Sequence, residues 1–245
     1  MKVSIVTAVF NEASTLDATL ESLERQIFSG DVELIVVDGF SDDNTPDVLA
    51  RHKSMITKVI RRERRGVYDA INAGLHCATG DIVGILHGND RLASSLVLQH
   101  IADAFAADSG LDFVYGNVVY AAPGSERIIR RYDCRRFSSR LVAYGCCPPH
   151  PSLYIRLGAM RDIGDYSTRY SICGDFDMWI RLFANSRFHH KYIDEDIVVM
   201  SPGGLSGTWR ARLWRNNVER MAVLRDNGLP ASFGRLLMKY WIMNR

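Results

Sequence analysis

The chain has 245 residues, of which 47% are hydrophobic and 24% charged, and 30 basic against 28 acidic residues leave a formal charge of +2. A disordered chain would have fewer apolar residues and a larger net charge, so the composition predicts a soluble, folded protein of one or two domains. The near-neutral total argues against a dedicated nucleic-acid binder, and the composition excludes low-complexity and collagen-like chains.

Short apolar runs alternate with amphipathic segments through residues 1–120. The runs predict four strands, at residues 3–9, 34–37, 56–60 and 82–86. Their residues are apolar on both faces, so both faces of the sheet must be covered. The sequence therefore predicts an α/β fold with a mostly parallel central sheet and helices on both sides.

Amphipathic segments between and after these runs predict three helices. The first opens with a capping-box pattern at residues 14–17, and the others span residues 67–77 and 94–107. The residues expected to face the core are Leu16, Leu20, Leu23 and Ile27 in the first helix and Leu96, Ile101 and Phe105 in the third.

The alternation changes after Gly116. Further strands are predicted at residues 118–120, 128–132 and 153–155, and a helix over residues 175–184 directs Trp179, Leu182 and Phe183 toward the core. No linker rich in Gly, Ser or Pro and no internal repeat divides the chain. We therefore expect one domain over residues 1–204, with residues 1–120 and 121–204 as its two halves.

The last segment, residues 205–245, differs in charge from the rest. It carries eight Arg or Lys and two acids, a charge of +6, whereas residues 1–204 have a charge of −4. Gly228 and Pro230 divide it into two predicted helices. Its aromatic residues alternate with bases, which suits the surface of an anionic membrane. The alternative is that the helices pack against the body or against a second subunit of a homo-oligomer.

Five cysteines without CxxC spacing predict reduced thiols in a cytoplasmic protein. A zinc site of Cys146, Cys147 and His150 is disfavoured, because adjacent cysteines are poorly placed to chelate one ion. The sequence shows no signal peptide, and no stretch reaches the roughly 20 apolar residues of a membrane-spanning helix. We expect a cytoplasmic protein that associates, through its basic segment, with the inner face of the membrane.

Polar residues follow three of the predicted strands, at residues 10–12, 38–45 and 87–90. In an open parallel sheet, ligands bind beyond the carboxyl ends of the strands. Carboxylates and amides at this edge could hold a base, a ribose and a metal-bound diphosphate. A dinucleotide-binding G-x-G-x-x-G does not follow the first strand, and the Gly-Lys-Ser/Thr of a P-loop is absent, so both glycine-loop sites are excluded.

Seven blocks occur in a consistent order along the chain. They are VSIVTAVFNE at 3–12, IVVDGFSDDNT at 35–45, GVYDAINAG at 66–74, ATGDIVGILHGND at 78–90, PHP at 149–151, GDFDMWIRL at 174–182 and GGLS at 203–206. Together they resemble family 2 glycosyltransferases of the Rossmann-like GT-A fold, most closely bacterial exopolysaccharide enzymes of the colanic-acid type. The resemblance implies inverting transfer of a sugar from a UDP- or GDP-linked donor to a lipid-linked oligosaccharide or polysaccharide.

The resemblance also implies a set of donor-binding residues. Asp38 would contact the nucleoside, and the residues around or beside it would be Thr7, Phe10, Asn11, Glu12, Ser41, Asp69, Asn72 and Asn89. Asp38 has the alternative role of a turn or helix cap, since Asp-Gly commonly makes turns. Asp69 and Asn72 have the alternative of simple exposure on a helix.

Asp90 matches the last acid of the family's metal-binding motif, which implies Mg²⁺ or Mn²⁺ as cofactor. Gly88 and Asn89 stand where acids are common, so one carboxylate is left and metal binding without the donor should be weak. The alternative role for Asp90 is to cap a helix after the strand.

Asp175 matches the general base that takes the proton of the acceptor hydroxyl. Asp177 is its local rival, but residues two apart on a helix face different directions. His150 and Arg65 are candidates for contacts to the acceptor or the phosphates, and both have a structural or solvated alternative. The arginines at 61–65 and those between 127 and 140 form basic segments that either bind phosphates or face solvent.

Two other function classes stay open. A catalytically silent module that binds nucleotide sugars or acts as a scaffold is suggested by the reduced metal motif. A nucleotidyltransferase is disfavoured, because no Lys- and Gly-rich phosphate loop follows the first strand.

Overall fold

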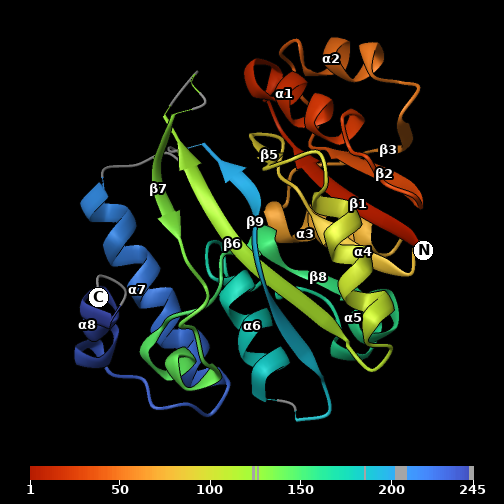
Figure 1. Cartoon of the computed structure of the whole chain (residues 1–245). Helices are drawn as coiled ribbons and strands as arrows, with labels where there is room; N and C mark the ends of the chain where they lie inside the picture. The colour runs from red at the N-terminus through yellow and green to blue at the C-terminus, as the bar shows by residue number, and fades with distance from the viewer. Residues whose placement is uncertain (123–124, 126, 185, 202–208, 243–245) are drawn as a thin grey trace.

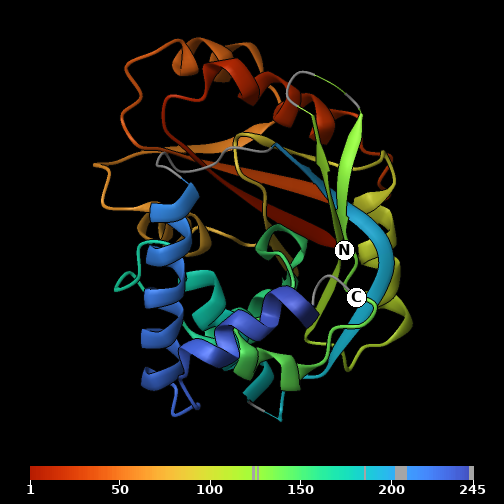
Figure 2. The same cartoon turned by 90° about the vertical axis from the view of Figure 1, so that its left-hand side faces the viewer.

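The computed structural model describes residues 1–122, 125, 127–184, 186–201 and 209–242. Its helices lie on both sides of one curved sheet, as the sequence predicts (Figure 1). The helices that follow the first strands lie at one end of the molecule, and the C-terminal helices lie at the opposite end in both views (Figures 1 and 2).

Within the described residues the sheet has nine strands. They are β1 (Lys2–Val9), β2 (Asp31–Asp38), β3 (Ile56–Arg61), β4 (Ile82–Ile85), β5 (Asp90–Leu92), β6 (Phe113–Ala121), β7 (Ile128–Tyr132), β8 (Tyr154–Arg156) and β9 (His190–Met200). Their order is β3-β2-β1-β4-β8-β6-β9-β5, and β7 pairs with β6.

The two halves of the sheet differ in strand direction. Strands β3, β2, β1 and β4 are parallel, as predicted for the first half. In the second half β8 is antiparallel to both β4 and β6, and β9 is parallel to β6. Strands β5 and β9 were not predicted. The first is only three residues long, and the other carries polar, partly exposed residues along most of its length.

The helices are α1 (Ala13–Glu24), α2 (Thr45–Arg51), α3 (Val67–Leu75), α4 (Val97–Ala107), α5 (Leu157–Ile163), α6 (Gly174–Ala184), α7 (Trp209–Asp226) and α8 (Phe233–Ile242). Helices α1, α2 and α4 cover one face of the sheet, whereas α3, α5, α6 and parts of α7 and α8 cover the other. Neighbouring residues of the buried strands belong to opposite cores: Ile5 and Leu34 to the first, Val6 and Ile35 to the second. Strands β1, β2 and β4 are therefore buried on both faces along most of their length, which explains their continuous apolar runs, whereas β3, at the edge of the sheet, is largely exposed.

Two predicted helix starts are wrong. Helix α1 begins at Ala13, not with a capping box at Ser14, and its first amide donates to the carboxylate of Asp43, 3.2 Å away. Ile27 lies beyond the helix and is 66% exposed. Helix α4 begins at Val97, so Leu96 precedes it and is 40% exposed. In α1 an acid from another loop replaces the local cap, a contact that local spacing does not reveal.

The C-terminal segment forms two helices, as predicted, and they pack against the body. Val223, Leu224 and Leu236 are fully buried in the same core as α6. Gly228 lies between the helices with a φ of +68°, a conformation that favours glycine. The predicted boundary at residues 204/205 and the GGLS block lie outside the described residues. None of the helices in the described ranges is both long and apolar enough to cross a bilayer.

Candidate functional site

The loops after β1 and β2 are joined by polar contacts. The backbone N–H of Asn11 donates to Ser41 Oγ at 3.0 Å. The side chain of Asn11 makes two hydrogen bonds with Asp42. Asn11 and Phe40 both have positive φ, 53° and 58°. These contacts bring Phe10, Asn11 and Ser41 to the carboxyl edge of the sheet, where the sequence predicts a donor site.

Asp38, at the end of β2, is only 1% exposed. One carboxylate oxygen accepts hydrogen bonds from the backbone and hydroxyl of Ser41, at 2.9 and 2.7 Å. The other accepts from Arg61 Nε at 3.1 Å. Asp38 therefore stabilises its own turn, the alternative role that the Asp-Gly pair suggested, and it also pairs with the first arginine of the basic segment.

Three arginines of the basic segment at residues 61–65 lie against site residues. The Arg61 guanidinium is 5.2 Å from the centre of the Phe40 ring, and that of Arg64 is 4.5 Å from the Phe10 ring. Arg62 pairs with Asp69 of α3 at 3.0 Å. Arg65 is exposed and lies 3.5 Å from Glu63. Unlike the other three arginines of the segment, it does not contact a site residue among those that the structure describes.

Two carboxylates face each other between α1 and β5. Asp90 is 2% exposed, and neither of its oxygens nor Glu12 Oε2 has a hydrogen-bond partner in bonding geometry among the described residues. Burial, with the neighbouring Asp43 carboxylate, raises the pKa of Glu12 to about 7. Burial and then the Glu12 charge raise the pKa of Asp90 to about 7, although the backbone amide of Ser201 acts in the opposite direction. The Glu12 charge thus disfavours the charged form of Asp90, as the Asp43 charge does for Glu12.

Gly88 makes room for this pair. A Cβ atom at residue 88 would lie 2.2 Å from Glu12 Oε2, closer than real Cβ contacts allow. Asp90 begins strand β5 and does not cap a helix, which excludes its alternative role. Two buried oxygen-bearing groups without protein partners suit a hard divalent cation that takes its remaining ligands from a diphosphate and water.

Within the described residues no group of three or more His, Cys, Asp or Glu side chains could hold a metal. The five cysteines are free, and no zinc set forms from Cys146, Cys147 and His150.

Asp175 lies in the first turn of α6, partly buried. Tyr68 donates its hydroxyl hydrogen to the Ile172 carbonyl at 2.6 Å and lies 3.3 Å from Asp175 Oδ1. The approach of Tyr68 requires Gly174, since a Cβ there would be 2.7 Å from the tyrosine ring. Burial raises the pKa of Asp175, while the charge of Arg220 and hydrogen bonds from Phe176 and Tyr68 oppose that rise.

Two buried histidines are neighbours, and one of them, His87, feels the charge of Asp175. The rings of His87 and His150 are 6.1 Å apart, and His150 Nε2 is 2.7 Å from the hydroxyl of Tyr166. Burial lowers the pKa of each histidine to about 4, and for His87 the His150 ring adds to the effect, while the Asp175 charge opposes it. His150 is therefore neutral at pH 7 and braces Tyr166, whose ring stacks on Tyr68 at 6.0 Å.

Asp177 points away from Asp175. Its carboxylate pairs with Arg181 Nε at 2.9 Å and accepts a hydrogen bond from Asn227 at 2.9 Å. The first contact lies within α6, and the second joins α6 to Asn227, directly after α7, so Asp177 has a structural role in its present position.

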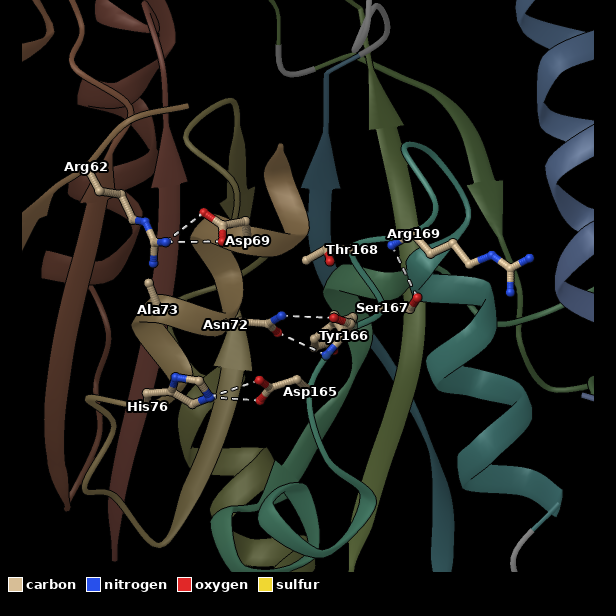
Figure 3. Close-up of a pocket in the computed structure, with 10 residues that line it drawn as sticks. All are labelled: Arg62, Asp69, Asn72, Ala73, His76, Asp165, Tyr166, Ser167, Thr168 and Arg169. Carbon is tan, nitrogen blue, oxygen red and sulfur yellow. Dashed lines mark hydrogen bonds and ion pairs between the residues drawn. The ribbon is translucent and has the colours of Figure 1, made fainter. Parts of the chain in front are cut away.

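Asn72 and Asp69 line an open pocket of about 640 Å³ between α3 and the loop at residues 165–169 (Figure 3). The Asn72 amide exchanges hydrogen bonds with the backbone of Tyr166 at 2.8 and 2.9 Å, so it clamps the two halves of the domain. Figure 3 also shows His76 paired with Asp165 across the pocket, at 2.9 Å. Asp38, Asp90 and Asp175 do not line this pocket.

The remaining predicted donor residues lie on the same sheet edge. Thr7 is buried in β1, with its hydroxyl unpaired among the described side chains, and Asn89 lies in the turn before Asp90. Tyr68, His87 and Arg220 are further residues near Asp175 that were not predicted as site residues. Tyr68 and His87 lie within the family-like blocks at residues 66–74 and 78–90, whereas Arg220 lies in the basic segment that was predicted to contact a membrane.

Known proteins resemble the chain in sequence and in fold. The profile described as Glycosyl transferase family 2 matches residues 4–156. A PGL/p-HBAD biosynthesis glycosyltransferase of Mycobacterium bovis is 34% identical over 211 residues, 84% of this chain and 79% of the relative. The crystal structure of S. aureus TarS with UDP has a TM-score of 0.71 at 18% identity, covering 95% of this chain and 67% of that one. The structure of the mannosyltransferase PcManGT from Pyrobaculum calidifontis, with GDP-Man and Mn²⁺, has a TM-score of 0.68 at 20% identity. The match covers 96% of this chain and 67% of that one.

These matches confirm the family resemblance and the GT-A fold that it implied. The two solved structures are too distant in sequence to show more than the fold.

The buried His150 predicts a loss of stability in acid. Its folded pKa of about 4 is below the ordinary 6.5, so the unfolded chain takes up the proton first as the pH falls. The stabilisation is present above pH 6.5 and disappears as the pH falls toward 4. We expect His150→Gln to remove about 2–3 kcal/mol of the difference in unfolding free energy between pH 7.5 and pH 4.5. Urea unfolding at both pH values measures it, with the exposed His189→Gln as control; equal pH dependence in all three proteins would contradict the prediction.

Proposed function

Because the chain belongs to glycosyl transferase family 2, we propose that it is an inverting enzyme that transfers a sugar from a UDP- or GDP-linked donor to a hydroxyl of a lipid-linked oligosaccharide or polysaccharide. Glycosyl transfer itself follows from the family. The nucleotide donor is supported by the fold relatives solved with UDP and with GDP-Man. A role in biosynthesis is supported by the mycobacterial relative, which is named a PGL/p-HBAD biosynthesis glycosyltransferase.

The observation that carries the proposal is the position of the turn at residues 87–90. This turn closes with a 3.0 Å hydrogen bond from the Asp90 amide to the His87 carbonyl. Asp90, at one end, faces Glu12, while His87, at the other, feels the charge of Asp175. A donor diphosphate at the carboxylate pair would therefore place its sugar toward Asp175.

Asp175 is the proposed general base. As the acceptor oxygen bonds to the anomeric carbon, its hydrogen passes to the Asp175 carboxylate, and the bond from the anomeric carbon to the diphosphate oxygen breaks. The diphosphate leaves with that electron pair. Tyr68 holds Asp175 from the side of α3, so the carboxylate enters the reaction in a fixed orientation.

Glu12 and Asp90 are the residues that would hold a Mg²⁺ or Mn²⁺ ion, which fits their unpartnered oxygens. When bound, such an ion neutralises the charge that develops on the departing diphosphate. Phe10, Asn11, Asp38 and Ser41 would surround the nucleoside, with Thr7 beneath them and Asp69, Asn72 and Asn89 at the border of the site. Arg61, Arg62 and Arg64 supply positive charge near the phosphates.

Asp175→Asn should abolish transfer and leave donor binding nearly unchanged. The amide has the shape of the carboxylate but cannot accept the hydroxyl proton, so we expect turnover to fall at least about 1,000-fold. Product formation with a panel of acceptors and donor affinity by calorimetry measure the two effects. Asp177→Asn is the matched control and should retain more activity, because its carboxylate points away; full turnover by Asp175→Asn would reject the base assignment.

Asp90→Asn and Glu12→Gln should each weaken the part of donor binding that depends on metal. Each removes one carboxylate from the proposed ion, and we expect affinity for UDP in saturating Mn²⁺ to fall by about 10-fold or more. Calorimetry with Mn²⁺ and with EDTA separates the metal-dependent part, and the exposed Asp103→Asn on α4 serves as control. Unchanged Mn²⁺ dependence in Glu12→Gln would remove Glu12 from the metal site.

The exposed face of α7 and α8 supports a membrane-bound acceptor. Trp214 and Val218 are one helical turn apart on α7, Phe233 and Leu237 on α8, and Trp214 lies 5.7 Å from Phe233. All four are exposed, at 63%, 46%, 38% and 50%. Exposed arginines at 215, 225 and 235 accompany them. Apolar side chains beside cations suit an anionic lipid surface.

Trp214→Glu combined with Leu237→Glu should release the protein from anionic vesicles without disturbing the core. The measurement is co-sedimentation with vesicles of phosphatidylglycerol and phosphatidylcholine, and of phosphatidylcholine alone. We expect at least about a 10-fold loss of binding to the anionic vesicles, because the change replaces apolar contact by negative charge. Val59→Glu, exposed on β3, is the matched control. Equal sedimentation of all three proteins would leave this face as an assembly surface.

A further inference from the structure

Helix α7 fastens the segment that leads into the proposed base. The Glu219 carboxylate accepts hydrogen bonds from the backbone amides of Ile172 and Cys173 at 2.8 and 3.0 Å, and from the Ser171 backbone and hydroxyl. Tyr68 holds the same segment from the other side through the Ile172 carbonyl. Because Asp175 follows two residues after Cys173, its position depends on α7 as well as on α3.

The next residue of α7, Arg220, reaches the start of α6. Its guanidinium lies 4.5 Å from the centre of the Phe176 ring, next to Asp175 in the chain. Nε donates to the Asn216 side chain and Nη1 to the Gly145 carbonyl, both at 2.7 Å. These acceptors are neutral, and no carboxylate of the described chain lies within ion-pair distance, 4.0 Å, of Arg220. The positive charge of Arg220 is therefore not neutralised by a direct ion pair with a described carboxylate.

Arg220 differs in kind from the other groups that act on Asp175. They are Tyr68 on α3, His87 in the turn after β4, and Tyr166, Cys147 and Cys173. These are neutral near pH 7, because burial raises the pKa of the tyrosines and thiols and lowers that of His87. Arg220 is the one permanent cation among them. Its charge opposes the rise in the pKa of Asp175 that burial causes.

We propose that Arg220 is a positioning residue that keeps the Asp175 carboxylate ionised for proton transfer, while Glu219 holds the segment before it, so that helix α7 is part of the catalytic centre. This inference rests on the proposed role of Asp175 as base. It assigns the C-terminal helices a function inside the enzyme, independent of any membrane contact.

The test compares Arg220→Gln with Arg220→Lys. Glutamine can still donate to the Gly145 carbonyl but lacks the charge, whereas lysine keeps the charge. A base acts only when ionised, so kcat/KM falls as the pH drops below its pKa. Without Arg220 that pKa rises, and we expect the acidic limb of the kcat/KM profile to move up by about 1 pH unit, an approximately 10-fold loss on that limb.

Arg220→Lys should return the limb toward its native position, and the exposed Arg161→Gln on α5 is the control. A folded Arg220→Gln protein whose limb coincides with the native one would overturn the proposal. So would a shift that Arg220→Lys does not reverse, since a purely steric role would then explain it.

A second measurement does not depend on turnover. In protein labelled with ¹³Cγ-aspartate, the resonance that disappears in Asp175→Asn reports the ionisation of Asp175. Its titration midpoint should be about 1 pH unit higher in Arg220→Gln than in the native protein. An absence of transfer by the native enzyme would refute the proposed function, whereas unchanged ¹³C titration would refute the action of Arg220 on Asp175 alone. Where Arg220→Gln does not fold, Arg220→Met takes its place in both measurements.

Discussion

The burial of carboxylates at one edge of the sheet is the constraint on which the rest of this molecule depends. A buried carboxylate is costly unless it is paired, hydrogen-bonded or protonated. Asp38 is compensated by Ser41 and Arg61, and Asp175 by Tyr68 and the charge of Arg220. Glu12 and Asp90 have no such compensation in the described chain. The fold thus leaves its least satisfied groups where a cation and a diphosphate would satisfy them.

The two cores hold this edge in place. Helices α1, α2 and α4 fix the loops after β1 and β2 from one side, whereas α3, α6 and α7 fix Tyr68, Asp175 and Arg220 from the other. The clamp between Asn72 and the Tyr166 backbone joins the halves, at 2.8 and 2.9 Å. Two glycines leave the space that these groups need, since Gly88 makes room for the Glu12 carboxylate and Gly174 makes room for the Tyr68 ring. Larger residues at either position would displace a proposed functional group.

The sequence predicted the parallel half of the sheet because its strands are short, apolar on both faces and bounded by polar ends. It missed β9, whose partly exposed residues lack such a pattern, and the cap of α1, which Asp43 supplies from another loop. For the site, family blocks located Asp38, Asp90 and Asp175, whose roles stay predictions. They could not show that Glu12 faces Asp90 or that Asp177 pairs with Arg181. Such pairings join residues distant in the sequence, or depend on the direction of one side chain.

The spacing of residues on α7 changes how the charge asymmetry of the chain is interpreted. Asn216, Arg220, Val223 and Leu224 share the face that packs on the body, while Trp214 and Val218 occupy an exposed face. The +6 segment is therefore not a uniformly basic appendage. The charge of Arg220 acts inward on Asp175, whereas Arg215, Arg225 and Arg235 are exposed. Since one helix carries both faces, α7 lies between its exposed apolar side chains and the segment that leads into the proposed general base.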